Sequence, residues 1–232
     1  MTANTNNVTF ETQSAEAILW SHIQNKAWIK VQKIISFQPN LAKPCNCACC
    51  QCCNKQHSPL LLACKLNPPI EVVERLIKAN PAAVFEADCE KRLPLHLACE
   101  YGASPEVIKK IVLSNVDATI TRDIYGMLPI HKVCESYFDN LDPLLSDMDA
   151  EDFLMEVVQG LLSIQPTSVL IEDNREMNPI EYAVDAELSM TIVKVLQQVS
   201  VSEHKKEVEV EVVYGSKFVH NKTRYCEELS AQ

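Results

Sequence analysis

The sequence predicts an all-α solenoid of stacked helix pairs, from a repeated proline and a repeated stripe of apolar residues. Short apolar segments begin with Pro59, Pro94, Pro129 and Pro179, so the prolines lie 35, 35 and 50 residues apart. The last interval equals one period of 35 residues with 15 residues added. A fixed period of this size indicates supersecondary units that bury their apolar faces only by stacking on one another.

Each proline is expected to start a short first helix, because the N–H that proline lacks has no partner at that position. Ser58 and Asn178 can cap two of these helices, whereas Leu93 and Leu128 cannot cap the other two. A second helix is expected about a dozen residues later, where apolar residues recur at i, i+1, i+4 and i+5. These residues are Val72, Val73, Leu76 and Ile77, then Val107, Ile108, Ile111 and Val112, then Val157, Val158, Leu161 and Leu162, and in a weaker copy Ile192, Val193 and Leu196.

The repeat unit resembles the ankyrin repeat, whose signature is T-P-L-H-x-A with a period of about 33 residues. The segment 93–98 reads LPLHLA and matches every position except the Thr. Tyr101-Gly102 resembles the family's inter-helix glycine, and Asp123 and Gly126 resemble its hairpin Asp and Gly. The resemblance covers roughly residues 57–198. It implies paired helices joined by polar hairpins, with His96 and His131 bonded to nearby backbone.

The predicted organisation is an array of about five units between two tails. The array takes residues 12–198, with a polar tail at 1–11 and a C-terminal tail or hairpin at 199–232. Its parts are a capping unit at 12–44, a Cys-rich loop at 45–56 and repeats at 57–91, 92–126, 127–176 and 177–198. The third repeat carries an insertion at 138–152, for which we consider a solvated acidic loop or an acidic element that docks a basic partner. Strict alternation over 207–212 is typical of a strand, although a loosely ordered tail fits equally.

The cysteines form two groups. Cys64, Cys99 and Cys134 share one position of the repeat and are expected to be small buried apolar residues. The second group has six cysteines within nine residues: Cys45, Cys47, Cys49, Cys50, Cys52 and Cys53. Dense thiolates suit Zn²⁺ or Cu(I), and His57 could add a ligand. S-acylation of the loop, or an insertion without any ligand, are the alternatives.

Composition narrows the function classes. The net charge of −10 disfavours nucleic-acid binding and favours a neutral or basic protein surface as the partner. No apolar run approaches the roughly 18 residues of a membrane span. The N-terminal segment lacks the apolar core of a signal peptide. Eleven cysteines then predict a reducing intracellular compartment, cytoplasmic or nuclear. No phosphate-binding loop or hydrolase motif is present in the sequence, so no enzymatic activity is expected.

The expected function is therefore that of a non-enzymatic, monomeric scaffold or adaptor that binds a partner protein. The resemblance implies that hairpin tips and first helices line the binding surface. Its contact candidates are Asp88, Glu90, Lys91, Arg92, Arg122, Asp123, Ile124, Tyr125, Asn174, Arg175 and Glu176. Among them Tyr125 is the best candidate for an anchor, because exposed aromatic residues are frequent hot spots, and the alternative is that it packs against the adjacent hairpin. The alternative function is soft-metal binding or thiol redox sensing through Cys45–Cys53.

Overall fold

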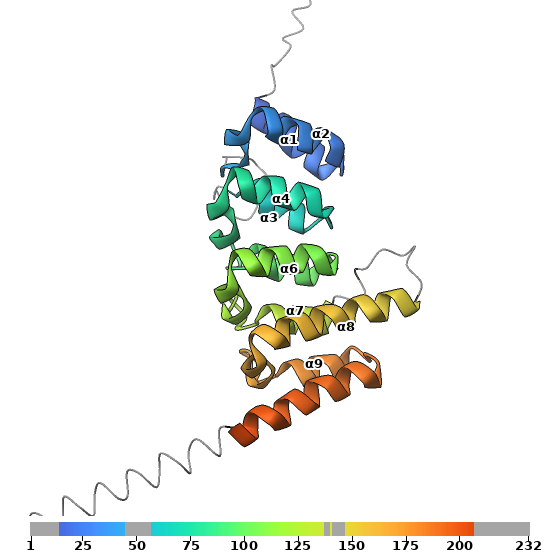
Figure 1. Ribbon diagram of the computed structural model, residues 1–232. Coiled ribbons are helices and arrows are strands. Elements are labelled where there is room, and N and C mark those ends of the chain that lie inside the picture. The colour runs from blue at the N-terminus through green and yellow to red at the C-terminus, as the bar shows by residue number, and fades with distance from the viewer. Residues whose placement is uncertain (1–13, 45–56, 137–139, 141–146, 207–232) are drawn as a thin grey trace, which may run out of the picture.

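The computed structural model describes residues 14–44, 57–136, 140 and 147–206. In these ranges the chain forms a row of helix pairs stacked one upon the next, and it contains no strand (Figure 1). The pairs are α1 (Ala15–Gln24) with α2 (Trp28–Phe37), α3 (Pro59–Cys64) with α4 (Ile70–Ala79), α5 (Pro94–Glu100) with α6 (Pro105–Ser114), α7 (Pro129–Ser136) with α8 (Asp147–Ile164), and α9 (Pro179–Asp185) with a helix over 190–206. Short 3-10 helices follow the second helices of the first four pairs: η1 (Pro39–Ala42), η2 (Pro81–Phe85), η3 (Val116–Ile120) and η5 (Pro166–Leu170). The predicted all-α solenoid of about five units is confirmed.

The helices form two layers. The first helices pack in the order α3, α5, α7 and α9, and the second helices pack in the order α2, α4, α6 and α8. The core lies between the layers and between successive units. Leu60, Leu95 and Ile130 occupy one repeat position and are each fully buried. No unit could bury these side chains without its neighbours.

Buried cysteines contribute to this core as the sequence predicts. Cys64, Cys99 and Cys134 are fully buried in the first helices α3, α5 and α7. Burial raises the pKa of the Cys64 and Cys134 thiols to about 12, since a thiolate would lose its hydration there. The three side chains therefore remain protonated at neutral pH and pack as small apolar groups.

Asparagine side chains join the ends of the second helices α4 and α6 to the preceding unit. Asn80 follows α4, and its Nδ2 donates to the carbonyl of Ala42 at 3.2 Å. Asn115 follows α6, and its Nδ2 donates to the carbonyl of Val84 at 3.2 Å. These two asparagines thus form hydrogen bonds between successive units.

The acidic part of the predicted insertion is helical. The prediction of a loop as far as residue 152 is wrong, because α8 begins at Asp147 and has 18 residues, compared with 10 in α6. Carboxylates near a helix N-terminus are favoured by its dipole, and Ala150 and Leu154 anchor the added turns in buried positions. Apart from Asn140, the rest of the insertion lies outside the described residues.

The array also extends further than predicted. The last helix runs to residue 206 instead of ending at 198. Residues 199–206 contain neither Pro nor Gly, and Val199 packs against the core while Glu203 is buried. The strand predicted at 207–212 lies outside the described residues. None of the helices over 14–44, 57–136 and 147–206 is long and apolar enough to cross a membrane.

The helix caps differ from the sequence prediction at one position. Asn178 caps α9 through Oδ1, and Glu181 completes a reciprocal capping box. Ser58 does not cap α3: its hydroxyl is buried and makes no capping bond. Burial of the apolar side chains of α3 holds that helix start instead.

We expect Leu95→Ala to lower the free energy of unfolding by about 2–5 kcal/mol, because it leaves a cavity between units. The matched control is Leu113→Ala, whose side chain is 68% exposed and whose loss should change stability by about 0.5 kcal/mol or less. Urea denaturation of both variants measures the difference. Equal effects would contradict the placement of the core.

Candidate protein-interaction surface

Three hairpins of one design connect the units, and each is built on a buried aspartate: Asp88, Asp123 and Asp173. In each case Oδ1 accepts the backbone N–H groups two and four residues later, at distances between 2.7 and 3.1 Å. These bonds fold the chain into a tight turn, which an aspartate favours because its short side chain reaches the following backbone.

The third residue after each aspartate adopts a left-handed conformation. The φ angles are 59° at Lys91, 79° at Gly126 and 61° at Glu176. Gly126 also meets a close neighbour, since an added Cβ would lie 2.5 Å from the Asn174 Oδ1 atom and 2.9 Å from its backbone N. The glycine is therefore needed for the approach of the next hairpin as well as for its own conformation.

Successive hairpins are bonded to one another. The N–H of Ile124 donates to the carbonyl of Glu90 at 3.0 Å, and the N–H of Asn174 donates to the carbonyl of Tyr125 at 2.9 Å. Arg122 adds bonds from its Nη1 to the carbonyls of Gly126 and Glu172. The three tips therefore form one continuous surface whose geometry is held by backbone contacts.

Two fully buried histidines tie each hairpin to the next. The N–H of Leu93 donates to His96 Nδ1 at 3.2 Å, so Nε2 carries the proton and donates to the carbonyl of Met127 at 3.3 Å. His131 repeats this arrangement, with Leu128 at 3.0 Å and the carbonyl of Ile171 at 2.9 Å. The backbone bonding implied by the family resemblance is confirmed, and the link to the following hairpin is an addition. Burial lowers the pKa of both histidines, to about 4 for His96.

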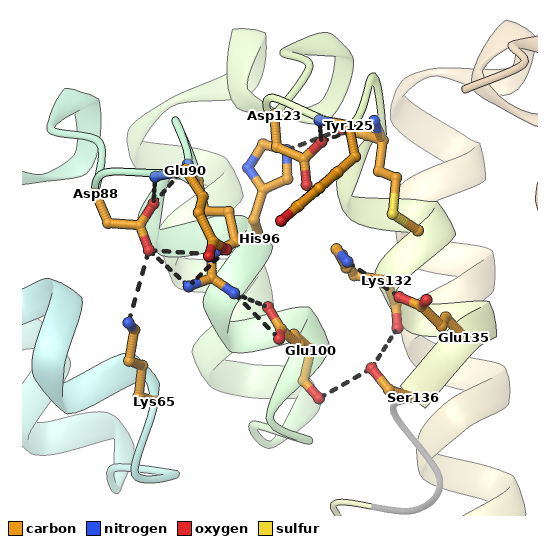
Figure 2. A network of polar contacts seen from close by, with 12 residues as sticks. Lys65, Asp88, Glu90, His96, Glu100, Asp123, Tyr125, Lys132, Glu135 and Ser136 are labelled. Carbon is orange, nitrogen blue, oxygen red and sulfur yellow. Dashed lines mark hydrogen bonds and ion pairs between the residues drawn. The ribbon is translucent and has the colours of Figure 1, made fainter. Parts of the chain in front are cut away.

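An ion network fastens the hairpin at Asp88 to α5 (Figure 2). The Arg92 guanidinium donates to Asp88 Oδ2 at 2.9 and 3.0 Å and to both carboxylate oxygens of Glu100 at 3.0 and 3.2 Å. Two further ion pairs belong to this network. Glu90 Oε2 lies 3.1 Å from Arg92 Nη2, and Lys65 Nζ lies 3.6 Å from Asp88 Oδ2. Burial alone would raise the pKa of the Asp88 carboxyl, but the bonds from Arg92 outweigh burial and lower that pKa.

The structure divides the eleven contact candidates into two groups. Exposed on the hairpins are Lys91, Arg122, Ile124, Tyr125, Asn174, Arg175 and Glu176. Ile124 and Tyr125 expose 42% and 48% of their surface, so they form an apolar centre among charged neighbours.

The other candidates, Asp88, Glu90, Arg92 and Asp123, are buried or make bonds within the array. The prediction that Asp88 contacts a partner is wrong, because the residue is 5% exposed and both carboxylate oxygens accept internal bonds. Arg92 and Glu90 belong to the same network, and Arg92 exposes 12% of its side chain. Asp123 is equally buried, but its Oδ2 has no hydrogen-bond partner within the described ranges.

Sequence reasoning missed Glu100 and Glu135 as part of this surface. They lie 35 residues apart, at one position of the repeat, on the first helices α5 and α7. Comparing polar residues at equal repeat positions, as was done for the cysteines, would have found them.

The Cys45–Cys53 cluster lies outside the described residues, so metal binding there stays a prediction. His57, suggested as an additional ligand, is buried beside Trp20 and Asp88 at a small cavity of about 70 Å³. Within the described ranges, no group of three or more His, Cys, Asp or Glu side chains could hold a metal ion.

Gly126→Ala should lower the free energy of unfolding by about 1–3 kcal/mol. The alanine must adopt a left-handed backbone conformation, and its Cβ collides with Asn174. Lys91→Ala is the control, since that position already holds a side chain at φ 59°. Thermal and urea unfolding compare the two variants. A Gly126→Ala protein as stable as the control would refute the close hairpin contact.

Stability should fall as the pH is lowered from 6.5 to 4. The folded protein keeps His96 neutral down to about pH 4, whereas the unfolded chain takes up this proton near pH 6.5. The unfolded state therefore binds more protons in this window. Each unit by which the pH is lowered reduces the free energy of unfolding by up to about 1.4 kcal/mol. His96→Gln should be less stable at pH 7 and should show a shallower slope by about one proton. An unchanged slope would contradict the assignment.

Comparison with known proteins agrees with the repeated geometry. A family model described as ankyrin repeats (3 copies) matches residues 30–122, from α2 to the start of the hairpin at Asp123. Among curated proteins, none matches the chain. Beyond residue 122 the hairpins at Asp123 and Asp173 and the helices from α7 onward repeat the geometry of the matched units. Residues 30–122 are therefore similar to ankyrin repeats, and the later units share their geometry.

Proposed function

We propose that this protein is a non-enzymatic scaffold or adaptor that binds a partner protein on the hairpin tips and the adjoining first helices. Ankyrin repeats serve generally in protein–protein interaction. The continuous surface of hydrogen-bonded tips, with Ile124 and Tyr125 exposed at its centre, is the observation that supports this site. A preformed surface binds with a smaller loss of conformational entropy than a mobile one.

The net charge of the chain indicates what kind of partner surface it favours. The chain carries a net charge of −10, which favours association with a neutral or basic protein surface. We assign the surface no chemical reaction of its own. His96 and His131, which bond to the hairpins, each use both ring nitrogens in bonds to backbone, so neither is available as an acid or base.

Tyr125→Ala combined with Arg175→Ala should weaken partner binding about tenfold or more, since central aromatic and arginine side chains contribute most of the energy of an interface. A photoreactive amino acid at position 124 first captures the partner in cells. Titration calorimetry with the purified partner then compares the variant with the wild type.

The matched control is Phe37→Ala, because Phe37 is 86% exposed at the end of α2 in the first unit, whereas the three hairpins follow the second, third and fourth units. It should leave the affinity unchanged. If the tip variant bound as tightly as this control, the hairpin surface would not be the binding site.

A further inference from the structure

The three hairpin aspartates differ at their second carboxylate oxygen. Asp88 Oδ2 accepts bonds from Arg92, and Asp173 Oδ2 accepts a bond of 2.7 Å from the hydroxyl of Tyr182. Asp123 Oδ2 is buried and has no such donor in the described part of the chain. A buried acceptor without a donor destabilises the folded state, and more so when it is charged. The hairpin at Asp123 therefore lacks a donor that the hairpins at Asp88 and Asp173 both have.

The repeat register shows which group is missing. Thirty-five residues after Asp88, Arg92 and Glu100 stand Asp123, Met127 and Glu135. Both acids that bind the Arg92 guanidinium thus recur, while the arginine is replaced by a methionine whose side chain belongs to the core. This chain therefore repeats the acidic part of its own arginine site without the arginine.

Lys132 does not supply the missing donor to Asp123. It is the repeat equivalent of Tyr182, which bonds to Asp173 in the next unit. Lys132 Nζ donates instead to Glu135 Oε2 at 3.0 Å. This bond uses one oxygen of Glu135, whose side chain is 36% exposed.

An aromatic ring adjoins the two acids. Tyr125 stands at the repeat position of Glu90, the third acid around Arg92. Figure 2 shows its side chain beside Asp123, extending from the hairpin toward the helices that carry His96 and Lys132. A guanidinium stacks favourably on an aromatic face and can donate to two carboxylates at once, which a lysine ammonium does less well.

We propose that Asp123, Glu135 and Tyr125 form a recognition site for an arginine side chain of the partner protein. The inference rests on the proposed function and specifies one contact of that surface. The exposed Tyr125 ring turns about its Cα–Cβ bond to admit the guanidinium, which donates to Asp123 Oδ2 and to Glu135 while stacking on the ring. The negative net charge of the chain favours the approach of such a partner.

The test uses the full-length chain and an array of random 12-residue peptides with a fixed central arginine. Each peptide is paired with twins that carry citrulline or lysine at that position, since citrulline keeps the shape of arginine without its charge. Fluorescence polarisation on the best binders should show the arginine peptide binding about tenfold or more tightly than its citrulline twin, as expected for a charge-assisted pair. The lysine twin should fall between them.

Two variants connect this preference to the site. Asp123→Asn with Glu135→Gln keeps Oδ1 as a hairpin acceptor and should abolish the difference between arginine and citrulline. Met127→Arg with Lys132→Leu copies the arrangement at Arg92 and Leu97, so its own guanidinium should occupy the site and remove the preference as well. Thermal unfolding checks that each variant is folded.

Equal binding of arginine and citrulline peptides by the wild type would overturn the proposal, as would a preference that survives in the folded Asp123→Asn, Glu135→Gln variant. A preference that emerges only in Lys132→Leu would show that Lys132 closes the site internally, and it would also overturn the proposal. If the arginine preference is absent while Tyr125→Ala with Arg175→Ala still weakens the captured partner, this inference fails and the proposed function stands. If that tip variant has no effect, the proposed function fails by a separate measurement.

Discussion

The hydrogen bond from each buried histidine to the following hairpin is the interaction on which the array depends. His96 Nε2 reaches the carbonyl of Met127, and His131 Nε2 reaches that of Ile171. Each ring also accepts the N–H at the start of its own helix, so one side chain joins a helix to the next turn. Asn80 and Asn115 make the corresponding connection backward, to the carbonyls of Ala42 and Val84. A unit is thus bonded to both neighbours, and the stacked apolar faces are held in register.

Much of the fold could be predicted because the period of 35 residues constrains every unit at once. The prolines marked the first helices, and the apolar stripes marked the second helices. Predictions failed where residues depart from the repeat. The acidic residues before Leu154 looked like a loop, although a helix N-terminus accommodates carboxylates and Ala150 adds buried contact. The end of the last helix was placed too early because its apolar stripe weakens before the helix itself ends.

The candidate surface was predictable in position but not in detail. Register alone placed Ile124, Tyr125, Asn174 and Arg175 at the tips, where they are exposed. Register could not show that both carboxylate oxygens of Asp88 accept hydrogen bonds within the array. Those bonds depend on the position of the Arg92 side chain, which Glu100 in α5 also holds. Charged residues in a turn are usually solvated, and only three-dimensional contacts distinguish a solvated carboxylate from one that organises the turn.

The column of buried cysteines gives the protein a set of internal reporters. Cys64, Cys99 and Cys134 lie in three consecutive units, each fully covered, with thiol pKa values raised by burial. A thiol reagent can modify such a side chain only after its own unit opens and the thiolate forms in water. The order in which the three are labelled would therefore record the order in which the units open. In a quasi-one-dimensional array, that order shows whether unfolding begins at one end or in the middle.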